Sequence, residues 1–148
     1  MRVLCNAVYE RAKGTDKRVA FAIDEAHYLM NDATSLKFLE TAVRHSRHYH
    51  LSLHFIAQTG GEFALTPEAR TIANLCSLTL VHWVQKEADT FVEWFGLIEC
   101  EVNWIRTAKA GNDEDGFSEA LLGIDEEGWF PLRVRASDFE VGALSSTE

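Results

Sequence analysis

Residues 19–27 read VAFAIDEAH, and this stretch decides the expected fold. The run from Val19 to Ile23 is entirely apolar, which is typical of a central parallel strand that is buried on both faces. Two carboxylates, Asp24 and Glu25, follow where the strand ends. Ligands of open α/β sheets bind at the carboxyl ends of strands. The stretch therefore predicts a buried strand that leads into a polar site.

The rest of the chain alternates between helix-like and strand-like patterns. Apolar periodicity predicts a helix that ends near Gly14, and Thr66 followed by Pro67 is a helix start. The other expected segments are a helix around 36–43, strands over 51–57 and 77–84, short helices over 86–95 and 101–109, a polar loop over 112–116, and a hairpin formed by 120–124 and 129–134. This order predicts an α/β fold with a mainly parallel sheet and a C-terminal antiparallel hairpin.

The acidic pair and a glutamine suit phosphoryl transfer. Asp24 is placed to hold Mg²⁺, and Glu25 to polarise an attacking water as general base. Gln58 follows the second apolar run, and its amide can donate to a γ-phosphate while it accepts from the water. The structural alternatives are an aspartate that caps the next helix and a glutamine that bonds its own loop.

Basic and histidine side chains cluster between these two strand ends. Arg44 and Arg47 are spaced so that they share one helix face, and they fit either an arginine finger or helix C-terminal charges that interact with the macrodipole. His45, His48, His50 and His54 bring no cysteine or acid to complete a zinc site, so we expect solvated or core histidines. His27 is expected at most to support the acidic pair.

Composition excludes several classes of protein. The 148 residues suffice for one domain, and a net charge of −9 does not attract nucleic acid non-specifically, so a DNA contact would be local or built by assembly. Three separate cysteines predict neither disulfides nor a zinc knuckle. We find no membrane-spanning run and no signal peptide, so the expected location is the cytoplasm, including the inner face of the cell membrane.

A resemblance to a known family rests on three segments: the stretch from Val19 to Met30, the segment over 41–49 and the run from Leu51 to Thr59. Together they resemble the HerA/FtsK branch of P-loop ATPases. The resemblance is closest to the traffic ATPases of conjugation and type IV secretion (TraC and TrbE type). Trp94 to Leu97 and the hairpin end over 132–137 resemble that family's C-terminal portion. The similarity extends from about Val3 to Glu140. In this comparison Asp24 and Glu25 correspond to the Walker B motif.

The resemblance implies a RecA-like core over residues 1–140, with residues 141–148 as a flexible tail. It also implies ATP and Mg²⁺ as cofactors and a homo-oligomer, a hexameric ring, that moves DNA or secreted protein within secretion or conjugation machinery. By position, Asp24 serves Mg²⁺, Glu25 the water and Gln58 the γ-phosphate. Arg44 or Arg47 serves the neighbouring subunit's nucleotide.

One motif of that family is missing. The sequence has no G-x-x-x-x-G-K-[ST] loop to cradle the phosphates. In the family this loop lies upstream, and its strand belongs in the sheet beside the Gln58 strand, so we expect an open sheet edge and no hydrolysis by this chain alone. Two alternatives remain: a non-catalytic interaction module of an ATPase ring, and a DEAH-type helicase fragment. Such helicases carry Ser/Thr-Ala-Thr after the next strand, whereas this chain has Ala57-Gln58-Thr59 there. The difference argues against the helicase fragment.

Overall fold

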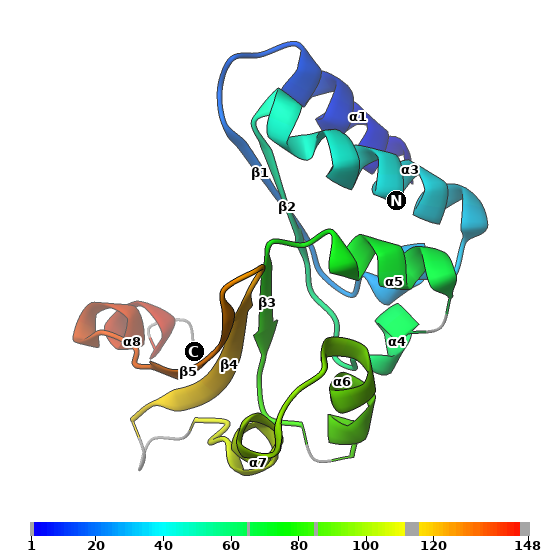
Figure 1. Ribbon diagram of the computed structural model, residues 1–148. Helices are drawn as coiled ribbons and strands as arrows, with labels where there is room; N and C mark the ends of the chain where they lie inside the picture. Colours follow the sequence, from blue (N-terminus) through cyan, green and yellow to red (C-terminus); the bar gives the residue numbers. More distant parts are fainter. Residues whose placement is uncertain (1, 65, 85, 112–115, 146–148) are drawn as a thin grey trace. The chain divides into compact units, whose positions relative to one another are not determined.

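The computed structural model describes residues 2–64, 66–84, 86–111 and 116–145 (Figure 1). The chain divides into two compact units, Met1–Cys76 and Ser77–Glu148. The first contains a parallel pair of strands, β1 and β2, and the second contains an antiparallel sheet of order β3-β4-β5. The predicted mixed α/β fold is confirmed. We expected a single domain over residues 1–140, and the boundary between the two units lies inside that range.

The first unit packs helices against one face of its two strands. Asp32 accepts a hydrogen bond from the Ser35 amide at the start of α3, and Thr66 accepts one from the Ala69 amide at the start of α5, where Pro67 occupies the first turn as predicted. Its elements are α1 (Arg2–Lys13), β1 (Val19–Ile23), α2 (His27–Met30), α3 (Ala33–Ser46), the 3₁₀ helix η1 (Arg47–Tyr49), β2 (Leu51–Phe55), α4 (Gly61–Ala64) and α5 (Pro67–Asn74).

The β1–β2 pair is covered on one face only. Phe21 and Ile23 point into a core with residues of α1 and α3, whereas Ala20 and Ala22 are exposed. The prediction of a strand buried on both faces is therefore wrong for this structure. The prediction counted Ala20 and Ala22 as buried apolar residues. Burial of one methyl group contributes only about 0.8 kcal/mol of stabilising free energy, so an alanine is tolerated on a buried or an exposed face.

The second unit contains the predicted third strand, the helix pair and the hairpin. Gly96, at φ 65°, ends α6 in the left-handed conformation that favours glycine. The Glu101 carboxylate accepts a 2.8 Å hydrogen bond from the Ile98 amide at the start of α7. The elements are β3 (Leu78–Val81), α6 (Ala88–Phe95), α7 (Glu99–Thr107), β4 (Ser118–Ile124), β5 (Gly128–Val134) and α8 (Asp138–Ser145).

Two expectations concern segments that the structure describes only in part. Residues 112–115 of the expected polar loop lie outside the described residues. We expected a flexible tail from residue 141, but the chain is helical up to Ser145, within α8, and residues 146–148 lie outside the described part. The backbone of α8 therefore continues regular structure beyond the expected limit of the domain.

The antiparallel sheet packs one face against α6 and α7. Val81 and Leu121 are buried with Phe91 and Ile105, and Trp129 packs against this cluster. Trp129 lies opposite Gly123 in the register, and a side chain at Gly123 would meet the indole at 2.6 Å. A glycine at this position is therefore required by the ring that crosses it.

Among the described residues, β2 and β3 are edge strands of their sheets. Among the described residues β2 pairs only with β1, and β3 pairs only with β4. An edge strand presents unpaired main-chain N–H and C=O groups. The expectation of an open sheet edge agrees with this topology.

An ion pair ties β4 to β5 in the second unit. The Arg133 guanidinium donates to Glu119 at 2.9 Å, the Lys109 amide donates to the same carboxylate at 3.2 Å, and these contacts lower the pKa of Glu119 below its ordinary value of 4.5. A group with a lowered folded-state pKa stabilises the fold above its unfolded pKa and loses that contribution as the pH falls through the folded-state value.

We therefore expect Glu119→Gln to lower the urea midpoint at pH 7 and to differ progressively less from the unsubstituted chain as the pH falls from about 4.5 through the lowered folded-state pKa of Glu119, below which both side chains are neutral. The matched control is Glu127→Gln, which changes an exposed residue between β4 and β5. A Glu119→Gln difference that stays constant from pH 7 to pH 3 would contradict the assigned ion pair.

Candidate functional site

The acidic pair lies where β1 ends, and β2 holds this segment in place. The Ile56 amide donates to the Ile23 carbonyl at 2.9 Å, and the Ala26 amide donates to the Ile56 carbonyl at 2.9 Å. Ala26 is fully buried between these contacts. Parallel pairing therefore continues past the strand ends, so Asp24 and Glu25 are placed beside the end of β2.

Glu25 and Gln58 are in direct contact, although 33 residues separate them. The Gln58 amide nitrogen donates to Glu25 Oε1 at 2.5 Å, and His27 Nδ1 lies 3.2 Å from Glu25 Oε2. The carboxyl ends of β1 and β2 therefore lie side by side. Both oxygens of the Glu25 carboxylate thus have a neighbour that sets their direction.

The backbone of Glu25 is strained. Its φ is 51°, in the left-handed region that is costly for a residue with a β-carbon. Outliers of this kind cluster at functional sites, where neighbouring contacts hold them. Nothing in the local sequence indicates this conformation, and only the position of His27, two residues after Glu25, indicates that the histidine can reach the carboxylate.

Asp24 has the chemistry that a magnesium ligand needs, but it acts alone. It is exposed, and its Oδ1 accepts a 2.9 Å hydrogen bond from the Glu25 amide. Within the described residues no group of three or more His, Cys, Asp or Glu side chains could hold a metal ion. Mg²⁺ is commonly bound by one or two carboxylates together with waters and substrate phosphates. Asp24 therefore fits Mg²⁺ that arrives with a nucleotide, not a metal site built by the protein.

The two arginines lie away from the acidic pair. Arg44 pairs with Glu40 on its own helix at 2.8 Å, and Arg47 begins η1, which leads into β2. Arg47 lines a shallow groove with Arg18 and His50 at the amino ends of the strands. Five residues of strand, about 15 Å, separate this end from the carboxyl end. Within this chain the structure does not bring Arg44 or Arg47 to Glu25.

The histidine cluster has ordinary contacts. His45 and His48 pack near the Tyr49 ring, with centroids 6.4 and 5.0 Å away, and His54 Nε2 lies 2.9 Å from the Ser52 hydroxyl. These partners are aromatic rings and a hydroxyl group. The expectation of solvated or packed histidines fits these contacts.

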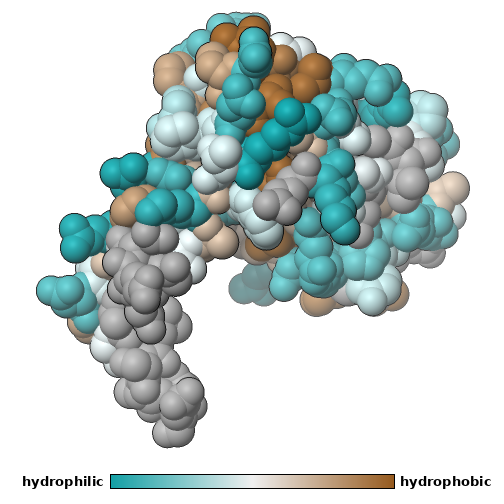
Figure 2. All heavy atoms as spheres, turned by 90° about the horizontal axis from the view of Figure 1, so that it is seen from below, coloured by the Kyte–Doolittle hydropathy of each residue, from teal (hydrophilic) through white to brown (hydrophobic). Residues whose placement is uncertain are grey.

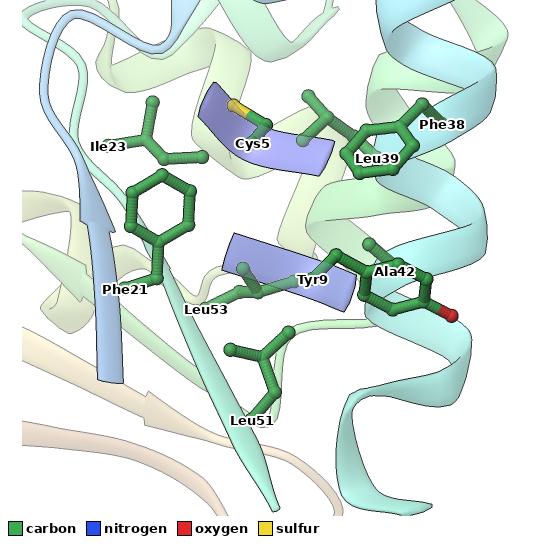
Figure 3. A pocket seen from close by; sticks show the side chains of 9 residues that line it. All are labelled: Cys5, Tyr9, Phe21, Ile23, Phe38, Leu39, Ala42, Leu51 and Leu53. Carbon is green, nitrogen blue, oxygen red and sulfur yellow. The ribbon is translucent and has the colours of Figure 1, made fainter. Parts of the chain in front are cut away.

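An apolar gap in the first unit belongs to the core (Figure 3). Its volume of about 10 Å³ hardly admits a water molecule. In the figure, side chains from α1, β1, α3 and β2 converge on it, and burial raises the pKa of the Cys5 thiol among them. A small apolar space with an unreactive thiol is a packing gap and not a ligand site. The lining residues are Cys5, Tyr9, Phe21, Ile23, Phe38, Leu39, Ala42, Leu51 and Leu53.

The arrangement of these elements defines a mixed α/β fold with a parallel strand pair and an antiparallel sheet. No protein-family model matches the sequence, and no curated protein sequence matches it. A solved structure, that of VirB4 of Thermoanaerobacter pseudethanolicus, shares the fold with a TM-score of 0.75 at 22% sequence identity. The match covers 94% of this chain and 37% of the VirB4 chain, so this chain spans about a third of its length. The resemblance to traffic ATPases is thereby confirmed at the level of the fold.

Two further observations describe the surface and the helices. The face of the molecule drawn in Figure 2 carries mainly hydrophilic residues, with smaller hydrophobic areas between them. In the part of the chain that the structure describes, every helix is too short or too polar to cross a membrane.

The strain at Glu25 can be measured with a glycine and alanine pair. Both substitutions remove the contacts with Gln58 and His27, but only glycine relieves the positive φ. We expect Glu25→Gly to be more stable than Glu25→Ala by about 1 kcal/mol in urea unfolding. At Ala22, an exposed strand position in the same unit, the order should reverse, with Ala22→Gly less stable by roughly 0.5–1 kcal/mol. A Glu25→Ala protein more stable than Glu25→Gly would contradict the strained conformation.

Proposed function

We propose that this chain is the Walker B half of an ATP-hydrolysing motor of the conjugation and type IV secretion class. The observation that carries the proposal is the contact between Glu25 and Gln58 at adjacent carboxyl ends of parallel strands. The fold shared with VirB4 supports the same class. Such a motor would move DNA or protein at the inner face of the cell membrane, in partnership with the secretion machinery.

In this proposal three side chains divide the chemistry. Asp24 presents an exposed carboxylate to hold Mg²⁺, which neutralises phosphate charge when it is bound together with ATP. Glu25 accepts a proton from the attacking water as general base. Gln58 now donates its amide N–H to Glu25, and the same group can donate to a phosphate oxygen while its carbonyl accepts from the water.

Arg44 and Arg47 enter the proposal as residues that act on a neighbouring subunit. Both lie near the amino ends of the strands, and the Glu25 site lies at the carboxyl ends. A ring of subunits, a hexamer by the family resemblance, can place the amino end of one sheet beside the nucleotide of the next. Arg47 lines the open groove there, whereas Arg44 must first leave Glu40. We therefore favour Arg47 as the arginine finger.

The phosphate-binding half must come from a P-loop outside these 148 residues. A backbone nest and a lysine are needed to hold the phosphates, and the sequence contains neither in the required order. The chain alone is therefore expected to bind nucleotide poorly and to hydrolyse none. The same observation favours a second candidate, a non-catalytic module that joins an ATPase ring.

Nucleotide binding to the isolated chain tests the half-site. We expect a fluorescent ATP analogue with Mg²⁺ to show no binding at millimolar nucleotide, because Asp24 alone cannot hold the phosphates. Binding in the micromolar range that is lost in Asp24→Ala would contradict the half-site and require a complete site within the chain. The control is Asp125→Ala, in the turn after β4.

Hydrolysis can be tested in a chimera in which this chain replaces its counterpart in VirB4. We expect the chimera to hydrolyse ATP and Glu25→Gln to reduce turnover by about 100-fold or more, the usual effect of losing a general base. Glu127→Gln should leave turnover unchanged. Unchanged turnover in Glu25→Gln would remove this residue from the role of base, and a chimera that folds but hydrolyses nothing would favour the interaction module.

A further inference from the structure

A basic groove lies at the amino ends of the two parallel strands, at the opposite end from Glu25. Its volume of about 420 Å³ is within the range of ligand-binding clefts. The Val19 amide donates to the His50 carbonyl at 3.0 Å, which fixes the start of β1 beside the turn that precedes β2. Arg18, Arg47 and His50 line the groove, and no acidic side chain is among the described residues that line it.

Positive charge gathers on the two segments that form this groove. Residues 11–18 and 44–50 contain six of the nine lysines and arginines of the first unit, and Asp16 is their single acidic residue. The two segments lie at the same end of the strands, and Lys13 Nζ lies 5.9 Å from the centroid of the Tyr49 ring (Figure 1). The second unit, by contrast, carries 5 basic and 15 acidic residues. The net charge of −9 therefore conceals a local basic region.

Some of these cations are neutralised within their helices, and others are not. Lys13 pairs with Glu10 at 2.9 Å, and Arg44 pairs with Glu40 at 2.8 Å. Within the described part of the chain, three cations of the two segments form no ion pair: Arg11, Lys17 and Arg18. Their charge is available to an anionic partner.

Stabilisation of helix ends does not account for all of this charge. Arg11 and Arg47 lie where α1 and α3 end, and a helix C-terminus attracts positive charge. Lys17 and Arg18 come after α1 has ended at Lys13, and the attraction is confined to the last turn. The cations beside the start of β1 therefore have no part in stabilising a helix end.

Flat rings border the groove on the side of the 3₁₀ helix. His45 and His48 are exposed, and their ring centroids lie 6.4 and 5.0 Å from that of Tyr49. Aromatic and imidazole rings stack on unpaired bases, whereas the bases of a duplex are already stacked on one another. Cations in a groove together with rings for stacking are typical of surfaces that bind single strands. A membrane surface or an acidic peptide has no base to place on such rings.

We propose that the basic groove binds the phosphodiester backbone of a single-stranded nucleic acid, with bases stacked on His45 and His48. Lys17, Arg18 and Arg47 donate to phosphate oxygens, as lysines and arginines commonly do in nucleic-acid complexes. Exposed charges farther apart than about 8 Å are largely screened at physiological salt, so the local excess of cations governs this contact. The inference goes beyond the proposed function, because the groove is at the opposite end of the strands from Glu25 and binding requires no ATP.

The test measures fluorescence anisotropy of a labelled oligothymidine of about 20 nucleotides with the isolated chain at pH 8. We expect a Kd of about 10 μM or tighter at about 50 mM NaCl. Three phosphate contacts, at about −0.7 each, give a slope of log K against log salt of about −2. Arg47 is left unchanged, because it also enters the proposal of an arginine finger.

A double variant tests the cations beside β1. Lys17→Ala with Arg18→Ala should weaken binding about tenfold or more and reduce the salt slope by about 1.4, the contribution of two phosphate contacts. The matched control is Lys37→Ala with Arg135→Ala, which removes the same charge at exposed positions outside the groove. This control should change the Kd by less than about twofold. Equal losses in the two double variants would show an effect of net charge alone and would overturn the proposal.

A second variant tests stacking separately from charge. His48→Ala should weaken binding severalfold and leave the salt slope unchanged, because a stacked ring releases no counter-ion. His82→Ala is the control, since His82 is an exposed histidine of the second unit. Unchanged affinity in His48→Ala would remove this ring from the binding surface.

Other partners are outcomes that overturn the proposal. Polyglutamate, or vesicles that contain phosphatidylserine, bound more tightly than oligothymidine and released by the Lys17 and Arg18 substitutions would make the partner an acidic protein or a membrane. Duplex DNA bound more tightly than the single strand, or no binding at about 100 μM chain, would also overturn it.

The fate of this inference is separate from that of the proposed function. A VirB4 chimera that hydrolyses ATP, made from a chain that binds no oligothymidine, leaves the enzyme standing and overturns the groove. An inactive chimera made from a chain that binds oligothymidine through Lys17 and Arg18 supports the groove and counts against the enzyme.

Discussion

The parallel pairing of β1 with β2 is the constraint on which the candidate site depends. Its hydrogen bonds continue one step past the strands, through Ile56 to Ile23 and Ala26, and this extension places Glu25 within reach of Gln58. Parallel strands have their carboxyl ends at the same edge of the sheet, so polar residues that follow each strand meet there. The covering helices α1 and α3 support the pair from one face only (Figure 1).

The Glu25 site combines local strain with well-directed contacts. A left-handed φ at a residue with a β-carbon costs of order 1 kcal/mol, and the buried Ala26 and the neighbouring strand hold the segment in that conformation. The carboxylate is directed by Gln58 on one oxygen and by His27 on the other. In the function that we propose, Glu25 is the base that activates water, and such a base is best fixed in advance because reorganisation during the reaction raises the barrier. The same contact fixes the position of the Gln58 amide, which in the proposed function would also donate to a phosphate oxygen.

Both sheets of the protein are covered on one face only, and they differ in what the other face exposes. The outward residues of β1 are alanines, whose exposure costs little. The outward residues of β3 and β5 include Leu78, Leu80 and Phe130, whose exposure costs much more per residue. The second sheet therefore exposes more apolar side-chain surface than the first.

The sequence by itself determined the order of the strands and of the longer helices up to the hairpin, the cap at Thr66, and the two strand ends that carry the acidic pair and Gln58. These are local properties, since periodicity, caps and turn residues act over a few positions. Only the tertiary structure decided that β1 is buried on one face, that His27 reaches Glu25, that Glu25 is strained, and that Arg44 and Arg47 lie at the far end of the strands. Burial depends on which elements are present to cover a sheet, and contacts across 33 residues depend on the register of the strands. The local pattern of apolar and polar residues determines neither the burial of a sheet face nor the contacts between distant residues.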